Sequence, residues 1–167
     1  MTNEQVLLFC LLGAAFLLFA WGRVRYDVVA VLALLIGAAI ETTGASTVVT
    51  GPILALEGEV PIWAILALVM VVTMRLSDVM NNAATAVIMA PIGLGIAHGL
   101  GVSLDPFLMA VAVGASSTYL TPIGHQSNLL VMGPGGYRFG DYWRMGLPLD
   151  LLIVAVAVPL ILWVWPL

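Results

Sequence analysis

The chain has 167 residues, of which 62% are hydrophobic and 8% charged, with a net charge of −4 and a mean hydropathy of +1.14. Soluble domains carry about 25% charged residues, so this composition excludes an ordinary soluble protein and indicates an integral membrane protein. The sequence has no lysine and no basic patch, which excludes nucleic acid as a partner.

Two helices are predicted at the start of the chain, at about residues 5–22 and 28–40. A secretory signal would carry a basic residue before its apolar core, whereas here Glu4 precedes the core and Arg23 and Arg25 follow it. We therefore interpret the first run as a retained helix. The positive-inside rule places the loop between the two helices in the cytoplasm and the N-terminus outside.

The rest of the chain is expected to continue as a membrane protein. An irregular amphipathic segment at 41–60 precedes a helix at about 61–77 and a polar-headed segment at 78–101, and the last helix is predicted at about 146–164. Between them, a further helix should stop at Thr118 to Pro122. Several apolar runs are shorter than the roughly 20 residues that cross a bilayer as one straight helix. The predicted fold class is all-α, a polytopic transmembrane helical protein with broken or re-entrant pieces.

The first polar cluster, residues 77–91, interrupts this apolar background. Polar side chains at membrane depth are costly and tend to face a cavity or one another. If a helix begins at Ala83, then Asn82 is its natural N-cap, and the first N–H groups of that helix suit an anion. The alternative is that Asn81 and Asn82 only hydrogen-bond neighbouring helices together.

The second polar cluster, residues 116–136, predicts a discontinuous helix. Pro122 removes a backbone donor and disfavours helix at Thr121, and the glycines at 124, 133, 135 and 136 oppose a continuous helix. A broken helix exposes unpaired carbonyls that suit sodium and N–H groups that suit an anion. Both clusters are therefore expected to face one internal site.

Two ionisable residues in these clusters have ambiguous roles. Asp78 could titrate, coordinate a cation or pair with Arg75. His125 is a proton carrier, a substrate contact or simply a hydrogen-bonding residue. Residues 138–144, with two arginines and Asp141, are expected in an interfacial loop. Neither a nucleophile with a paired base nor a metal-ligand spacing emerges, so we expect no enzyme and no cofactor beyond a coupling ion.

The two clusters together resemble a known family. The stretch SDVMNNAATAVIMAPIG, followed later by TPIGHQSNLLVMGPGGYRFGDYWRMGLPL, is similar to the C-terminal half of the divalent anion:sodium symporter family. These are permeases with a citrate-transporter-like domain in the ion transporter superfamily. The opening GRVRYDVVAVLALL resembles their first helices, and the run T-P-x-G…N-x-x-V-x-G-P-G-G-Y is the most specific match.

The resemblance implies two inverted repeats, each with a re-entrant hairpin bearing a Ser-Asn-Thr-type motif and a nearby unwound helix. Asn81, Asn82 and Ala83 would take that motif's place, with Asn81 in place of the serine and Ala83 in place of the threonine. Sodium would be held around Asn82, Thr121 and Asn128. The implied substrate-binding residues are Asn81, Asn82, Thr85, Thr121, Pro122, Gly124, His125 and Asn128.

The sequence departs from the family in length. The first repeat's hairpin and unwound helix have no counterpart, and the helix pair runs at about 35–37 into a segment typical of the second half. We expect one membrane domain over 1–167, with an N-terminal helix pair at 1–40 and a remnant of the second repeat at 41–167. One repeat cannot complete a site between two. Either a homodimer or a partner half rebuilds it, or the chain is a truncated or internally deleted product.

The expected function is sodium-coupled transport of a small anion, carboxylate or sulfate-like, as the resemblance implies. A proton-coupled antiporter or arsenite-pump relative is an alternative, in which Asp78 or His125 should matter. A non-transporting membrane scaffold or pseudo-permease is the alternative from another class. The expected location is multi-pass in a cell membrane, the bacterial inner membrane, with the small anion and the lipid bilayer as partners.

Overall fold

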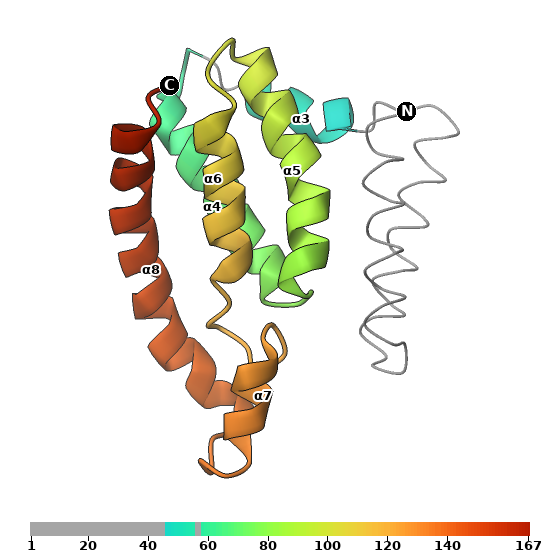
Figure 1. The fold of residues 1–167 in the computed structure, drawn as a ribbon, viewed down its shortest axis with the longest axis vertical. Coiled ribbons are helices and arrows are strands. Elements are labelled where there is room, and N and C mark those ends of the chain that lie inside the picture. The colour runs from blue at the N-terminus through green and yellow to red at the C-terminus, as the bar shows by residue number, and fades with distance from the viewer. Residues whose placement is uncertain (1–45, 56–57) are drawn as a thin grey trace, which may run out of the picture.

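The computed structural model describes residues 46–55 and 58–167, and the elements formed by these residues are all helices (Figure 1). The predicted all-α class is confirmed for this part of the chain. By length and composition, α5 (Asn82–Gly99) and α8 (Phe139–Val164) are long and apolar enough to cross a membrane. The predicted helices at 5–22 and 28–40, with their connecting loop and orientation, lie outside the described residues.

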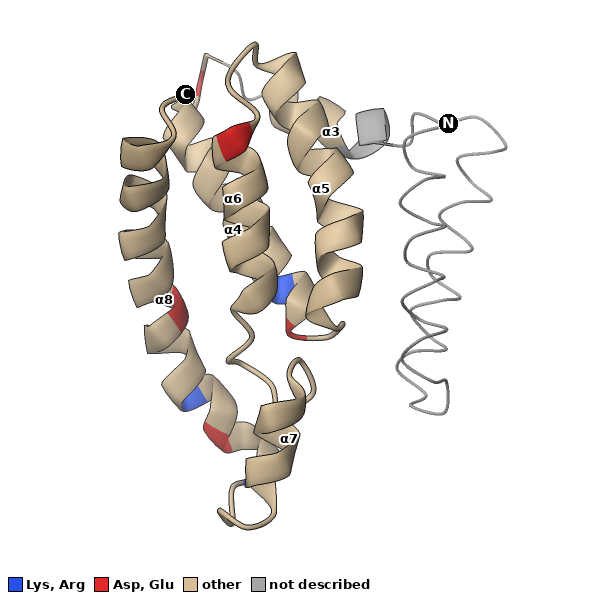
Figure 2. Ribbon diagram, in the orientation of Figure 1, with Lys and Arg blue, Asp and Glu red and all other residues tan. Residues whose placement is uncertain are grey.

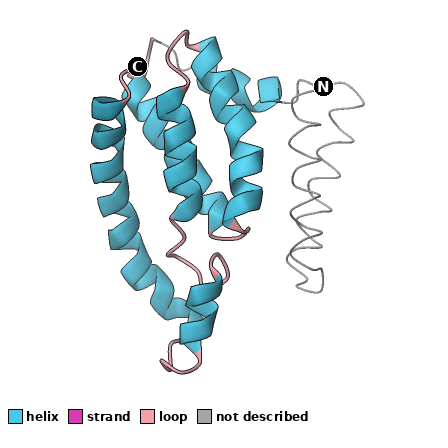
Figure 3. Cartoon of the chain, viewed as in Figure 1, coloured by secondary structure: helices cyan, strands magenta, loops and turns pink. Residues whose placement is uncertain are grey.

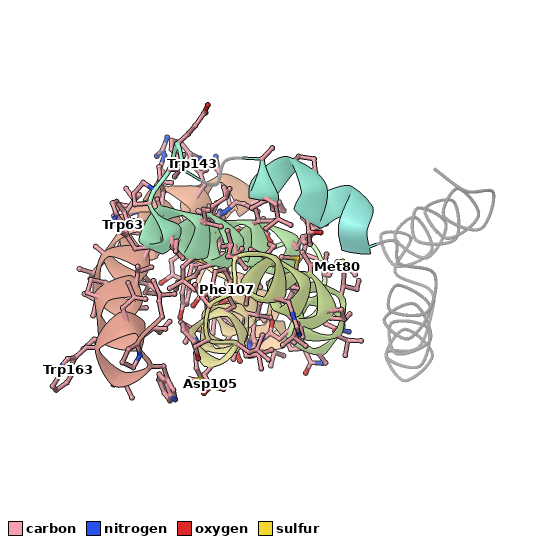
Figure 4. The ribbon with its side chains drawn as sticks, turned by 90° about the horizontal axis from the view of Figure 1, so that it is seen from above. Trp63, Met80, Asp105, Phe107, Trp143 and Trp163 are labelled. Atoms are coloured by element: carbon pink, nitrogen blue, oxygen red, sulfur yellow. The ribbon has the colours of Figure 1, made fainter. Side chains whose placement is uncertain are left out.

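A helical hairpin forms the centre of the bundle. Its first arm is α4 (Ile62–Ser77), the predicted helix at 61–77, and its second arm is α5. The turn between them, residues 78–81, is called the hairpin tip below. Helix α6 (Asp105–Ser116) packs against both arms, and Phe107 lies at the centre of the bundle, fully buried (Figure 4). The hairpin and α6 thus share one apolar core.

The segment predicted to be irregular at 41–60 is helical over α3 (Ser46–Leu54), so that prediction is wrong for these residues. Gly51 and Pro52 argue against a helix by propensity alone. Packing outweighs them, because Thr50 is buried and a side chain at Gly95 of α5 would lie 3.2 Å from the Thr50 methyl group. Tertiary contact with α5 decides the conformation of a short helix.

A discontinuous helix follows the core, as predicted. Helix α6 ends at Ser116, residues 117–125 have no helical structure, and α7 (Gln126–Met132) starts afterwards (Figure 3). The stretch 117–125 is called the unwound segment below. The break comes earlier than the expected Thr118, because the hydroxyls of Ser116 and Ser117 donate to the carbonyls four residues before them. These bonds compete with continued helix formation.

The last helix, α8, begins at Phe139, earlier than the predicted start near residue 146. Asp141 is responsible, since its carboxylate accepts the backbone N–H of Arg138 at 2.8 Å and so closes the first turn. The interfacial loop expected at 138–144 is therefore mostly helix. Trp143 and Trp163 mark the two ends of α8 and are 54% and 79% exposed, as membrane-anchoring rings would be (Figure 4). Pro148 and Pro159 lie inside the helix.

Candidate functional site

The hairpin tip and the unwound segment meet directly, so the structure brings the two polar clusters together. The Asp78 carboxylate accepts the backbone N–H of Leu120 at 3.1 Å. The Thr121 hydroxyl donates to the Asp78 carbonyl oxygen. Side chain and backbone of one residue at the tip therefore both hold the unwound segment.

Glycine at position 124 permits this close approach. A Cβ atom there would lie 2.8 Å from the Ser77 carbonyl oxygen and 3.1 Å from the Asp78 Cα. Such distances are too short for real Cβ contacts, so a larger side chain would separate the two segments. Pro122, two residues earlier, is fully buried in the same junction. Two of the residues predicted for the site from the family resemblance, Pro122 and Gly124, thus lie at the contact between the hairpin tip and the unwound segment.

The two asparagines of the tip have different roles. Asn81, and not Asn82 as predicted, is the N-cap of α5, because its side-chain oxygen accepts the Ala84 N–H at 2.7 Å. The predicted helix start at Ala83 is one residue late, which shifts the cap by one. Asn82 is the first residue of α5, and its amide oxygen lies 3.3 Å from the Ser77 hydroxyl.

Asn128 and Thr121, two of the residues predicted to hold sodium, are neighbours. The Asn128 amide donates to the carbonyl oxygens of Thr118 at 3.0 Å and Thr121 at 3.4 Å. Tyr142 of α8 donates from its hydroxyl to the Asn128 carbonyl at 2.7 Å. No pattern in the sequence marks Tyr142. Hydrogen bonds among the described residues join Asn82 to neither Thr121 nor Asn128.

The carbonyls at the end of α6 are not left unpaired, which corrects the prediction for this helix. Hydroxyl groups occupy the carbonyl oxygens of Ala112 and Val113, and Ser77 donates to that of Ala115 at 2.6 Å. The last carbonyls of a helix have no partner within the helix, and here hydroxyl side chains supply donors. Each carbonyl oxygen retains a second lone pair, and an ion could share it.

His125 and Thr85 differ in burial. His125 is exposed and caps α7, with its Nδ1 accepting the Ser127 N–H at 3.2 Å. Of the roles left open for His125, the structure shows that of a hydrogen-bonding residue. Thr85, on α5, is fully buried, and its hydroxyl has no hydrogen-bond partner among the described residues. Its place in the substrate site stays a prediction.

Three charged side chains form a cluster where α4, the hairpin tip and α8 meet. Arg75 Nη1 lies 2.9 Å from Asp78 Oδ2, and Arg75 Nη2 pairs with the Asp150 carboxylate. Pairing with Arg75, one of the roles left open for Asp78, is therefore realised. Sequence reasoning missed Asp150, although an ionisable residue inside a long apolar helix is itself a signal of a buried partner. Charged residues are otherwise sparse along the bundle (Figure 2).

A cavity of about 420 Å³ opens between α7 and α8 beside Asn128. Its walls are mainly aromatic and aliphatic, with tyrosine hydroxyls, one amide and one carboxylate as polar groups. The residues that define it include Tyr119, Asn128, Tyr137, Asp141, Tyr142 and Met145. This lining suits a mostly apolar neighbour more than a strongly hydrated ion.

Apart from the Asp78 carboxylate, the junction of the hairpin tip and the unwound segment offers neutral hydroxyl, carbonyl and amide groups. Within residues 46–55 and 58–167, no group of three or more His, Cys, Asp or Glu side chains could hold a metal ion together. Hydroxyl, amide and carbonyl oxygens are hard ligands that suit a weakly bound monovalent cation better than a transition metal. Backbone and side-chain amides can also donate to an anion.

Comparisons with known proteins point in one direction. The family model described as citrate transporter matches residues 8–167. An uncharacterized transporter of Synechocystis sp. is 38% identical over 143 residues, which is 84% of this chain and 23% of the relative. An uncharacterized transporter of Escherichia coli is 45% identical over 86 residues, covering 52% of this chain and 14% of the relative.

A relative with a named substrate is more distant. Sodium/sulfate cotransporter 1 of Chlamydomonas reinhardtii is 28% identical over 137 residues, covering 80% of this chain and 16% of the relative. In all three cases the chain spans less than a quarter of the relative's length. The relatives are transporters rather than enzymes.

Proposed function

Because this chain belongs to the citrate transporter family, we propose that it serves sodium-coupled transport of a small anion, carboxylate or sulfate-like, across a cell membrane. The bacterial inner membrane is the location we propose. The observation that carries the proposal is the meeting of the hairpin tip and the unwound segment at Asp78. Discontinuous helices of this kind build ion and substrate sites in transporters.

The α4–α5 hairpin is proposed to be re-entrant, with its tip inside the bilayer. In support, the tip contacts the unwound segment instead of continuing to the end of the bundle where α7 lies (Figure 1). Non-helical backbone at membrane depth is tolerated where protein buries it, and the buried Pro122 and Gly124 meet that condition.

Sodium is proposed to bind at oxygen atoms of Asn82, Thr121 and Asn128. Thr121 and Asn128 already share a hydrogen bond, and the Asn82 amide oxygen lies 3.3 Å from the Ser77 hydroxyl. A bound cation would draw these oxygens together and add positive charge where an anion then binds. The α5 N-terminus, capped by Asn81, would contribute N–H groups to the anion.

The remaining predicted substrate residues are proposed to complete this arrangement. Gly124 and Pro122 shape the junction, His125 caps α7, and Thr85 offers a buried hydroxyl. The described part supplies one hairpin and one discontinuous helix. A second set, from a second copy or a partner half, is proposed to complete the site.

Sodium binding is the property to test first. Purified protein in detergent should unfold at a higher temperature in sodium than in potassium at equal ionic strength. A site occupied at 100 times its Kd stabilises by about 2.7 kcal/mol. Sulfate or a small dicarboxylate should add a further rise only when sodium is present, because the cation creates the positive charge for the anion.

Two variants make the result specific. Asn82→Ala should abolish the sodium effect, whereas Ser116→Ala should keep it, because Ser116 is exposed and bonds only within α6. If sodium and potassium give equal melting temperatures in the unmodified protein, the amides merely join helices, and the scaffold function replaces transport. A response to pH in place of sodium would favour the proton-coupled alternative.

A further inference from the structure

The cavity between α7 and α8, called the tyrosine cavity below, is lined by three tyrosines. Tyr119 comes from the unwound segment, Tyr137 from the loop before α8, and Tyr142 from the first turn of α8. Helix α7 lies beside the start of α8 (Figure 1). Side chains from three segments therefore share one space of about 420 Å³.

Two of the tyrosine rings form a corner. The ring centroids of Tyr137 and Tyr142 are 6.3 Å apart, and the ring planes make an angle of 70°. A cation in such a corner can lie within about 6 Å of both centroids, which is the range of a cation–π interaction. The Tyr142 hydroxyl donates to the Asn128 carbonyl at 2.7 Å, and this bond fixes one wall of the corner.

One carboxylate belongs to the same lining. Asp141 precedes Tyr142 in the chain and also borders the cavity, and one of its oxygens accepts the Arg138 N–H. Within residues 46–55 and 58–167, the recorded ion pairs are those of Arg75, and none of them involves Asp141. The cavity therefore offers one negative charge that no basic side chain of these residues pairs with.

This lining disfavours an anion. The faces of aromatic rings carry the negative part of the ring quadrupole, so the tyrosine rings and the carboxylate both repel negative charge. The two nearby arginines, Arg138 and Arg144, are exposed and are not among the residues that line the cavity. A small metal ion would lose its hydration shell against aliphatic walls such as Val131 and Leu149. A cation with an apolar surface fits the lining better than either.

We propose that the tyrosine cavity binds a methylated ammonium cation. Such a group carries its positive charge beneath methyl groups, so it can contact both the ring faces and the aliphatic walls. The Asp141 carboxylate supplies the counter-charge. A free cation such as choline and the head group of phosphatidylcholine both carry this group. The site lies beside Asn128 but depends neither on sodium binding nor on transport.

Thermal unfolding in a neutral maltoside detergent measures this binding. Tetramethylammonium chloride should raise the melting temperature of the unmodified protein in a saturable way, relative to potassium chloride at equal ionic strength. Choline should act in the same way. Dimethylbutanol, in which a carbon atom replaces the choline nitrogen, has the shape without the charge and should give no comparable rise. Equal rises for choline and the alcohol would reduce the site to an apolar cavity and overturn the proposal.

Tyr137 offers a matched pair of variants, because this residue is 54% exposed and the loss of its ring should not unfold the protein. Tyr137→Phe keeps the ring face and should bind tetramethylammonium with unchanged affinity. Tyr137→Leu should weaken binding by about tenfold, the loss expected for one cation–π contact. Asp141→Asn should also weaken it, since the amide oxygen can still accept the Arg138 N–H but the charge is gone. Unchanged affinity in Tyr137→Leu and Asp141→Asn would contradict the proposal.

Lipid nanodiscs distinguish the two sources of the cation. In phosphatidylglycerol discs, which lack the ammonium group, added tetramethylammonium should raise the melting temperature. If the rise is absent in phosphatidylcholine discs, the lipid head group already occupies the cavity. If the rise persists there, a free cation is the ligand. The absence of a rise in both kinds of disc would overturn the proposal.

The sodium proposal and this one can fail separately. Tyr137→Leu should keep the sodium effect, and Asn82→Ala should keep the tetramethylammonium effect. A tetramethylammonium effect that is lost in Asn82→Ala but kept in Tyr137→Leu would place the cation at the junction of hairpin tip and unwound segment. That result would leave the tyrosine cavity without its proposed ligand.

Discussion

Gly124 sets the distance between the unwound segment and the hairpin tip. A Cβ atom there would meet the Ser77 carbonyl oxygen at 2.8 Å and the Thr118 Cβ at 3.0 Å. We expect Gly124→Ala to destabilise the protein by about 1–3 kcal/mol, since the backbone atoms of Ser77 and Asp78 cannot yield without moving the segment. Denaturant titration in detergent measures the change.

Gly133→Ala is the matched control for this substitution. Position 133 has no atom within 4 Å of an added Cβ and lies just after α7. Its stability should change by less than about 1 kcal/mol. Equal losses at 124 and 133 would mean that the contact between tip and segment does not limit stability.

Asn81 acts on the start of α5 through one hydrogen bond. Its side-chain oxygen accepts the Ala84 N–H at 2.7 Å. Asn81→Ala should therefore cost about 1 kcal/mol of folding free energy, whereas Asn81→Ser should retain most of it. Thermal unfolding of the two variants measures this difference, and a loss in Asn81→Ala that Asn81→Ser avoids identifies Asn81 as a helix cap. An unaffected melting temperature in Asn81→Ala would show that the cap contributes nothing.

At the scale of elements, α8 approaches the unwound segment at Gly146. An added Cβ would collide with the Tyr119 carbonyl group and lie 3.0 Å from the Leu120 nitrogen. Gly146→Ala should destabilise by about 1–3 kcal/mol by moving α8 outward. Gly140→Ala, in the same helix with open space around it, should be neutral or stabilising by up to about 1 kcal/mol. The free energies of unfolding of the two variants, compared at one detergent concentration, test whether close packing at Gly146 limits stability.

Helix existence and the break in the chain were predictable, whereas helix ends and partners were not. Apolar periodicity predicts α4 and α8, and Pro122 with its neighbouring glycines predicts the interruption before α7. The ends depend on single side-chain bonds, such as the Asp141 carboxylate that starts α8 early. Helix α3 depends on packing against α5, which local pattern does not contain.

For the candidate site, too, the sequence predicts which segments take part but leaves their individual contacts open. The two polar clusters are visible in the sequence, and their meeting follows from the cost of polar groups at membrane depth. Which asparagine caps α5 depends on whether the helix begins at Asn82 or at Ala83, a shift of one residue. Asp150 pairs with Arg75, 75 residues away along the chain. Such a pairing depends on how α4 and α8 pack, which composition and spacing leave open.

At the scale of the whole molecule, the hairpin tip lies short of the end of the bundle formed by α7 and the start of α8 (Figure 1). Single cysteines in a Cys10→Ser background test this against a membrane-impermeant thiol reagent. Leu104→Cys and Tyr137→Cys, both at exposed positions, should react from opposite sides of sealed vesicles. Val79→Cys, at the tip, should react from the Tyr137 side and more slowly, because protein and lipid limit access to it. Equal rates at 79 and 137 would mean that the hairpin crosses the whole bilayer.

Pro148 lies between two of the points at which α8 contacts the site, Gly146 beside Tyr119 and Asp150 at Arg75. Proline removes one helical hydrogen bond, so the carbonyl of Arg144 lacks its usual N–H partner, and the helix is mechanically weakest there. A small bend at this residue would change both contacts together. Such a bend would therefore link the position of the Trp143 end of α8 to the interior of the bundle.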